Sequence, residues 1–127
     1  MRIILDTSAL YYPRAVATIE RTGRTIVLPS IVFLERARQL QRDGHDGIAL
    51  MRRFAEAEEA QIEPYGMVET LRTLRLRVHA DPAWRRSSRD AMIAGHVGEG
   101  DVLWTADRRD FAALGLRPAQ ILDVAKL

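Results

Sequence analysis

Short apolar runs alternate with longer amphipathic stretches along the whole chain. The runs at 2–6, 25–28 and 102–105 are brief and rich in branched or aromatic residues, as is typical of buried strands. Two weaker runs, at 61–63 and 120–124, predict a short strand and an edge strand. Apolar residues recur at helical spacing near 13–22, 30–42, 48–59, 67–79 and 87–97. Strands that alternate with helices predict an α/β fold in three layers, α/β/α, with a central parallel sheet.

Two acidic residues follow predicted strands. Asp6 ends the run at 2–6, and Asp107 comes two residues after the run at 102–105, just before a short predicted helix. Open parallel sheets place their binding sites at the carboxyl ends of strands. Both carboxylates are therefore expected at the same edge of the sheet.

Two further acids lie on predicted helices. Glu35 follows Ile31 and Leu34 at helical spacing, so its carboxylate is expected on the stripe that faces the core. Asp90 shares an apolar stripe with later residues of the helix at 87–97, which one of two serines at its start can cap. Four buried carboxylates in one pocket would repel one another and lose hydration, and a divalent cation removes that penalty.

The composition bounds the class of protein. A length of 127 residues suits one domain, 1–127, and 47% hydrophobic with 28% charged residues is ordinary for a soluble globular protein. The absence of cysteine excludes disulfides, zinc–thiolate sites and a thiol nucleophile. Asp6 interrupts the first apolar stretch, which has no basic leader, so we expect no signal peptide, no membrane span and a cytoplasmic location.

Arginine accounts for all but one of the 19 basic residues, although the formal net charge is only +2. A GC-rich genome would explain the total count, so the clustering is the informative feature. The clusters that flank Asp90 and Asp107 are Arg85, Arg86 and Arg89, and Arg108 and Arg109. Guanidinium groups suit phosphate, and we predict that these residues contact a polyanionic substrate. Ion pairing with the neighbouring acids is the alternative.

Four segments carry an ordered pattern of acids and hydroxyl residues. They are Leu5-Asp6-Thr7-Ser8-Ala9-Leu10, Glu35 in a helix after the second strand, Asp90-Ala91-Met92-Ile93-Ala94, and Leu103-Trp104-Thr105-Ala106-Asp107-Arg108-Arg109-Asp110-Phe111. This set resembles the PIN domain ribonucleases, and among them the toxin of the VapBC toxin–antitoxin systems. The resemblance spans nearly the whole chain and implies a PIN-like fold.

The resemblance also implies which residues form the site. The catalytic, metal-binding set is Asp6, Glu35, Asp90 and Asp107. The hydroxyl residues that match positions near this pocket are Thr7, Ser8 and Thr105. Asp110 is a fifth acid that can support the ligands from outside, or can be an exposed residue that caps the last helix. Oxygen ligands without sulfur or clustered imidazole suit Mg²⁺, with Mn²⁺ as a substitute.

The activity implied by the resemblance is metal-dependent hydrolysis of RNA phosphodiester bonds by an endoribonuclease, the toxin of a type II toxin–antitoxin pair. The implied partners are RNA, contacted by the clustered arginines, and a small VapB-like antitoxin, and we also expect a homodimer. The residues after Glu35 lack the apolar residues and glycine often found there, and the region 45–82 carries no signature of the family. Neither region identifies the substrate or the partner.

Other classes of protein are less consistent with the residues. A receiver domain needs a lysine near the pocket, whereas the only lysine is Lys126. An aspartyl-phosphate phosphatase needs a second acid two residues after Asp6, where Ser8 stands. A non-catalytic PIN-fold module that binds a protein is the remaining alternative, and the presence of all four acids argues against it. The histidines have no mutual metal-ligand spacing, so no catalytic histidine is expected: they are His45, His79 and His96.

Overall fold

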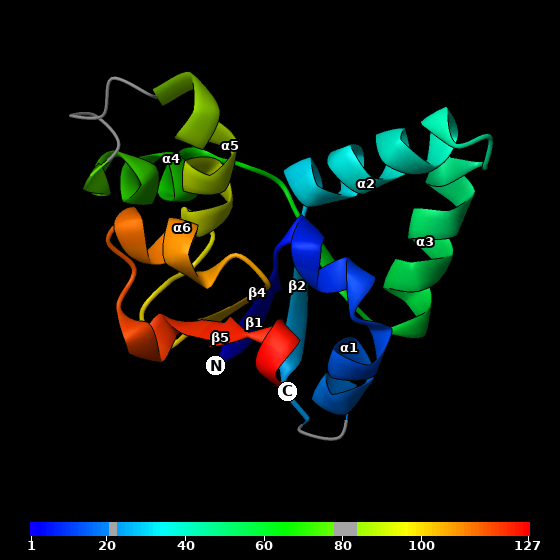
Figure 1. The fold of residues 1–127 in the computed structure, drawn as a ribbon, viewed down its shortest axis with the longest axis horizontal. Helices are drawn as coiled ribbons and strands as arrows, with labels where there is room; N and C mark the ends of the chain where they lie inside the picture. Colours follow the sequence, from blue (N-terminus) through cyan, green and yellow to red (C-terminus); the bar gives the residue numbers. More distant parts are fainter. Residues whose placement is uncertain (21–22, 78–83) are drawn as a thin grey trace.

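The computed structural model describes residues 1–20, 23–77 and 84–127, with a five-stranded sheet at the centre (Figure 1). The strands are β1 (Arg2–Leu5), β2 (Thr25–Pro29), β3 (Gln61–Glu63), β4 (Val102–Thr105) and β5 (Ile121–Asp123). Their order is β3-β2-β1-β4-β5, and every neighbouring pair is parallel. The predicted α/β class with a central parallel sheet is confirmed, as is the edge strand near the end of the chain.

Helices cover the sheet on both sides. On one side lie α1 (Pro13–Glu20), α2 (Ser30–Arg42) and α3 (Gly47–Ala57), and on the other lie α4 (Met67–Leu74), α5 (Trp84–Ala94) and α6 (Arg108–Ala113) (Figure 1). Three short 3₁₀ helices complete the described elements: η1 (Thr7–Tyr11), η3 (Pro118–Gln120) and η4 (Val124–Lys126). Within the described ranges, none of the helices is long and apolar enough to cross a membrane.

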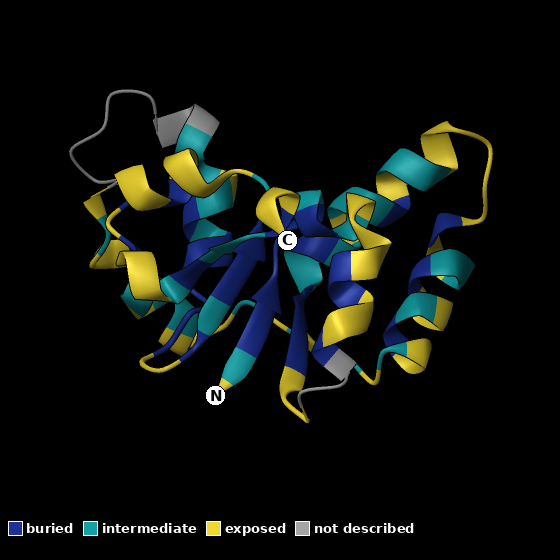
Figure 2. Ribbon diagram, turned by 60° about the horizontal axis from the view of Figure 1, so that its bottom comes forward, coloured by how far each residue is buried: buried dark blue, intermediate teal, exposed yellow. Residues whose placement is uncertain are grey.

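The core lies between the sheet and its helices. The three central strands, β1, β2 and β4, are mostly dark blue in Figure 2, because most of their side chains are buried. Ile3, Ile4 and Leu5 of β1 are 0% exposed, as are Val27 and Leu28 of β2. Parallel sheets covered on both faces favour such continuous apolar runs, which is why these strands were recognisable without alternation.

Apolar residues on two of the predicted helices are exposed. Leu34 of α2 is 65% exposed, because the residues of that helix that pack on the core include Val32 and Ala37. The apolar residues of α4, among them Met67 and Leu71, also face solvent. On α2, Ile31 packs against the core as expected, whereas Leu34 does not.

The contact between α4 and α5 explains why the apolar residues of α4 are exposed. Thr73 of α4 is buried, and its hydroxyl donates to the carbonyl oxygen of Ala91 at 3.4 Å. A Cβ added at Gly95 would lie 2.4 Å from Thr73 Oγ1. The helices approach through small and polar residues, which leaves the apolar residues of α4 on the outside.

The boundaries of two helices differ from the prediction. Helix α4 ends at Leu74, five residues short of the predicted end, and residue 78 of its predicted stripe lies outside the described ranges. Helix α5 begins at Trp84, so the predicted caps Ser87 and Ser88 lie inside the helix. Both boundaries flank residues 78–83, where the sequence offered only Asp-Pro as a break signal.

Candidate functional site

The strand order reverses between β1 and β4, and at the carboxyl ends of such strands open α/β sheets form a ligand-binding crevice. From β1 the chain first builds β2 and β3 on one side, and later adds β4 and β5 on the other. Open α/β sheets bind ligands where the strand order reverses in this way. Asp6 directly follows β1, and its backbone N–H donates to the Trp104 carbonyl oxygen at 3.0 Å. Asp107 follows β4, so both strand-end acids stand at this crevice.

Two hydroxyl groups fix the carboxylate of Asp6, which is 4% exposed. Ser8 Oγ donates to Asp6 Oδ2 at 2.7 Å, and Thr105 Oγ1 donates to the same oxygen at 2.8 Å. The Ser8 and Thr105 hydroxyl oxygens in turn accept from the backbone N–H groups of Ala106 and Asp107. Asp6 Oδ2 therefore accepts two hydrogen bonds, and the backbone N–H groups behind the two hydroxyls hold the donors in place.

Asp90 lies close to the other acids of the predicted site. Burial, followed by the negative charges of neighbouring acids, raises its pKa to about 6; these acids are Asp6, Asp110, Asp107 and Glu35. A carboxyl group whose ionised form is disfavoured by four other acids lies within electrostatic reach of all of them. The structure thus brings together the acids that the sequence singled out, with Asp110 as a fifth member.

Asp107 and Asp110 form the outer part of this acid cluster. Both side chains are exposed, and Asp110 lies in the first turn of α6. Partial burial raises the pKa of Asp107, and the charges of Asp6, Asp110 and Asp123 add to that effect. Asp110 is therefore exposed, and its charge acts on Asp90 and Asp107, although it lies in the first turn of α6 and is not its N-cap.

Glu35 joins the cluster from α2 and is paired with an arginine of α5. Arg89 Nη1 lies 3.1 Å from Glu35 Oε1. The other oxygen, Oε2, is buried and has no hydrogen-bond partner among the described residues. Thr7 Oγ1 is likewise buried without such a partner, whereas the sequence placed it near the pocket alongside Ser8.

The predicted phosphate contacts divide into three groups. Arg108 and Arg109 line a pocket of about 470 Å³ next to Asp107 and Asp110. Asp123 and Lys126 also line this pocket. Arg89 takes part in an ion pair, the alternative considered for it. The side chains of the remaining two, Arg85 and Arg86, lie outside the described part of the structure.

Comparison with known proteins bears on the fold. The sequence matches no protein-family model and no curated protein. The structure matches chains from three solved complexes: DNA-bound VapBC from Salmonella typhimurium, VapBC-1 from nontypeable Haemophilus influenzae, and VapBC2 from Rickettsia felis bound to a promoter DNA fragment. The respective TM-scores are 0.69, 0.75 and 0.70, at identities of 20%, 17% and 19%.

These matches extend over almost the full length of the chains. They cover 98%, 98% and 96% of this chain and 98%, 99% and 97% of the others. The chain has a PIN-like fold. The resemblance stated from the sequence motifs is therefore confirmed at the level of the fold, and the acid cluster lies at the switch point of that fold.

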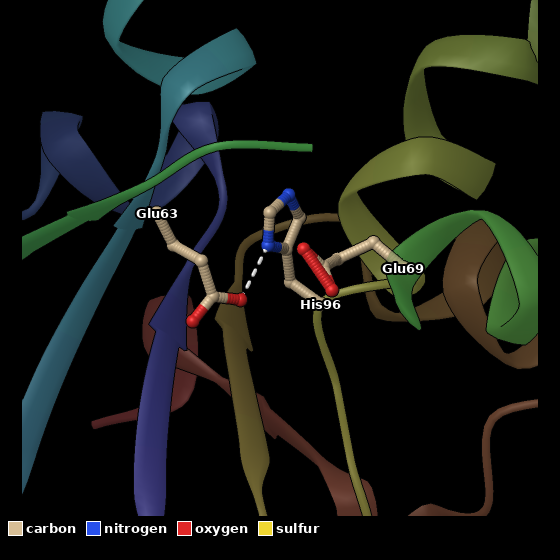
Figure 3. A group of neighbouring side chains, drawn as sticks. All are labelled: Glu63, Glu69 and His96. Atoms are coloured by element: carbon tan, nitrogen blue, oxygen red, sulfur yellow. Dashed lines mark hydrogen bonds and ion pairs between the residues drawn. The ribbon is translucent and has the colours of Figure 1, made fainter. Parts of the chain in front are cut away.

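A second group of polar side chains lies under the segment that leads from β3 to α4 (Figure 3). Ligand atoms of Glu63, Glu69 and His96 all lie within 4.8 Å of one another, so this group could hold a metal ion. Among the described residues, the four predicted acids do not form a group this tight. No motif in the sequence indicates this group, because its members come from separate elements.

Both oxygens of Glu63 in the second group already have partners within the chain. His96 is 0% exposed, and its Nδ1–H donates to Glu63 Oε1 at 2.7 Å. The other oxygen of Glu63 pairs with Arg2 Nη1. Arg2 also pairs with Asp101 at 2.9 Å. Both oxygens of Glu63 are thus engaged, and a metal ion would have to displace these partners.

The pKa values of Glu63 and of the neighbouring Asp101 are lowered. Burial alone would raise the pKa of Glu63, but hydrogen bonds from His96 and Arg2 outweigh it and hold the pKa below its usual value. The pKa of Asp101 is also lowered, since hydrogen bonds from Arg2 and the Gly98 backbone outweigh burial. These acids are stable as anions within the PIN-like fold without an added cation.

Proposed function

We propose that this chain is a metal-dependent endoribonuclease that hydrolyses RNA phosphodiester bonds. The observation that carries the proposal is the convergence of four acids at the switch point between β1 and β4, where burial and the neighbouring negative charges raise the pKa of Asp90 to about 6. Perturbed carboxylates in the crevice of an α/β sheet are typical of functional sites. The likeness to chains of VapBC complexes supports the fold on which the proposal rests.

The donor set fits a hard divalent cation. The cluster offers carboxylate and hydroxyl oxygens, which suit Mg²⁺ or Mn²⁺. Glu35 Oε2 is buried and unpartnered among the described residues. A buried carboxylate oxygen without a partner is costly, and a cation or its bound water satisfies it. These observations support a cation held by the cluster.

The four acids would have different roles in cation binding and proton transfer. Asp6, whose carboxylate is fixed by Ser8 and Thr105, and Asp90 would be direct ligands. Asp107 would complete the ligand set or support it, and Glu35 would accept a proton from the attacking water through its free oxygen. The chemistry that such a cation supplies is a water of lowered pKa and neutralisation of charge on the phosphate.

The neighbouring pocket would hold the substrate backbone. Arg108 and Arg109 line it together with Lys126, and they lie beside Asp107. Guanidinium groups bind phosphate oxygens through paired hydrogen bonds, so an RNA strand can run from this pocket across the acid cluster. This contact would be independent of base identity.

Measuring RNA cleavage tests the proposed activity. The purified protein, given a pool of structured RNAs, should cleave with Mg²⁺ or Mn²⁺ and be inactive in EDTA. Asp90→Asn keeps the size of the side chain but removes the ligand charge, and should be inactive while folded. Asp43→Asn, at an exposed residue that ends α2, is the matched control and should cleave normally. Undiminished cleavage by purified Asp90→Asn would overturn the assignment, and a folded wild type without cleavage would favour the non-catalytic binding module.

We further propose that the chain is the toxin of a type II pair, acts in the cytoplasm as a homodimer, and is inhibited by a small VapB-like antitoxin. The three matched structures are described as VapBC complexes, which supports such a partner. An acid cluster without its cation can be filled by a guanidinium that donates paired hydrogen bonds. The antitoxin would therefore compete with Mn²⁺.

Titration with a candidate antitoxin tests this mode of inhibition. Affinity should fall when Mn²⁺ is present, and Asp6→Asn should bind more weakly than wild type in EDTA. The titration uses wild type and Asp6→Asn, each with Mn²⁺ and in EDTA. Equal affinity in all four conditions would place the inhibitory contact outside the acid cluster.

A further inference from the structure

Arg89 and Glu35 join two helices across the rim of the acid cluster. Arg89 immediately precedes Asp90 on α5, and Glu35 lies on α2. The pair is asymmetric: the Arg89 side chain is 57% exposed, whereas that of Glu35 is 21% exposed. The arginine thus approaches Glu35 from the solvent side.

The two oxygens of Glu35 have different surroundings. Oε1 lies 3.1 Å from Arg89 Nη1. Oε2 is buried and has no hydrogen-bond partner in the described ranges. The charge of Glu35 contributes to the raised pKa of Asp90, so its carboxylate lies within reach of the cluster. One oxygen is therefore held by Arg89, and the other is buried without a partner among the described residues.

An exposed ion pair of this kind adds little to stability. What it does provide is orientation, because a contact to Oε1 restricts the rotation of the carboxylate about its last bond. Groups that orient the residues of a metal site change activity by about 10- to 100-fold when they are removed. The pair is thus better placed to control geometry than to hold the fold together.

We propose that Arg89 is a positioning residue: it fixes Glu35 through Oε1 so that Oε2 faces the acid cluster as a proton acceptor. This inference rests on the ribonuclease function proposed above. It replaces the earlier expectation that Arg89 contacts RNA phosphates. Because the pair has a single N–O contact, Arg89→Lys can still supply a charged partner for Oε1. Arg89→Gln cannot, since its side chain carries no charge.

Steady-state cleavage and RNA binding of Arg89 variants test the proposal. Arg89→Gln should lower kcat about 10-fold and leave KM within about twofold, because orientation is lost and substrate contacts are not. Arg89→Lys should recover most of kcat. Adding Arg89→Gln to Glu35→Gln should cause no further loss, because the arginine acts only through Glu35.

RNA affinity measured in EDTA gives a readout without catalysis. Arg89→Gln should bind RNA like wild type, with an unchanged salt dependence. A phosphate contact would instead weaken binding and reduce the slope of log affinity against log salt by about one. Arg38→Gln, on the exposed face of α2, is the matched control for loss of one charge.

The outcomes separate this proposal from the proposed function. If wild type does not cleave RNA, the ribonuclease function is overturned. If wild type cleaves and Arg89→Gln has a normal kcat, or a raised KM with a reduced salt slope, the positioning role is overturned. An additive loss in the double variant would also overturn it.

Discussion

Two groups of acids in this protein have opposite electrostatic character. In the cluster at the switch point, the pKa of Asp90 is raised to about 6 and that of Asp107 is also raised. In the group under the β3–α4 segment, the pKa values of Glu63 and Asp101 are lowered. Both groups are partly buried, so burial alone does not explain the difference.

The difference lies in the partners that the chain supplies. Arg2 contacts Glu63 and Asp101, and His96 donates to Glu63, so the second group contains its own counter-charges. In the acid cluster, Arg89 contacts only Glu35 among the described acids. Partly buried acids that are paired with a cationic side chain of the same chain stabilise the fold. Partly buried acids with too few cationic partners are stabilised by binding a cation from solution.

The largest expected effect is on RNA cleavage, which should depend on the acid cluster and not on the group around Glu63. Asp90→Asn should lower RNA cleavage by at least about 100-fold, because metal affinity depends on ligand charge. Glu63→Gln should leave kcat of the folded protein within a few-fold of wild type. Cleavage assays at saturating Mn²⁺ compare the two variants directly. The reverse pattern would assign the metal to Glu63, Glu69 and His96 and exchange the roles of the two groups.

The next effect is on stability. Arg2→Gln should reduce the free energy of unfolding by about 2 kcal/mol, since it leaves Glu63 and Asp101 without their shared cation; the value is discounted because Arg2 is partly exposed. Urea unfolding measures it. Arg38→Gln, exposed on α2, should change the free energy by less than about 0.5 kcal/mol. Equal effects of both variants would mean that the Arg2 contacts contribute nothing to the fold.

A smaller effect of opposite sign is expected in the acid cluster. In EDTA at neutral pH, Asp90→Asn should melt a few degrees above wild type, because neutralising Asp90 removes repulsion from four neighbouring charges. Mn²⁺ should raise the melting temperature of wild type more than that of the variant. Thermal melts with and without Mn²⁺ test both statements. A variant clearly less stable than wild type in EDTA would show that Asp90 is engaged as a structural anion.

The smallest effect concerns acid pH. The folded pKa of Asp101 lies below its unfolded value, so the folded state binds its proton less readily. Asp101 therefore contributes stability above the unfolded pKa, near 4, and that contribution is lost as the pH falls through the lower folded value. Between pH 5 and pH 3, wild type should lose more stability than Asp101→Asn. If the free energies of unfolding of the two proteins fell equally with pH, Asp101 would not differ in this respect from the acids of the cluster.

The sequence predicted the acid cluster better than its surroundings. Asp6 and Asp107 follow buried strands, and the edge of a parallel sheet brings such residues together whatever the details of packing. Their metal binding and catalysis stay predictions. The fixation of Asp6 by Ser8 and Thr105 matched the expected hydroxyl positions, whereas Thr7 has no described partner.

Helix orientation and long-range polar contacts could not be predicted from the sequence. Apolar periodicity shows that a helix has a face but not which neighbour that face meets, and Leu34 and Met67 are exposed for that reason. The contact of His96 with Glu63 depends on how the segment after β3 crosses the sheet, and residues 33 positions apart carry no local signal of it. Tertiary packing decided these positions.

The hydroxyl contact between Thr105 and Asp6 joins residues 99 positions apart, and this has a consequence for synthesis of the protein. On the ribosome, Asp6 emerges early, but the pocket around it cannot close until β4 has been translated and has paired with β1. An unfinished chain therefore lacks the assembled cluster. The ribosome that makes the proposed ribonuclease, and the messenger it reads, would face an inactive product until translation is nearly complete.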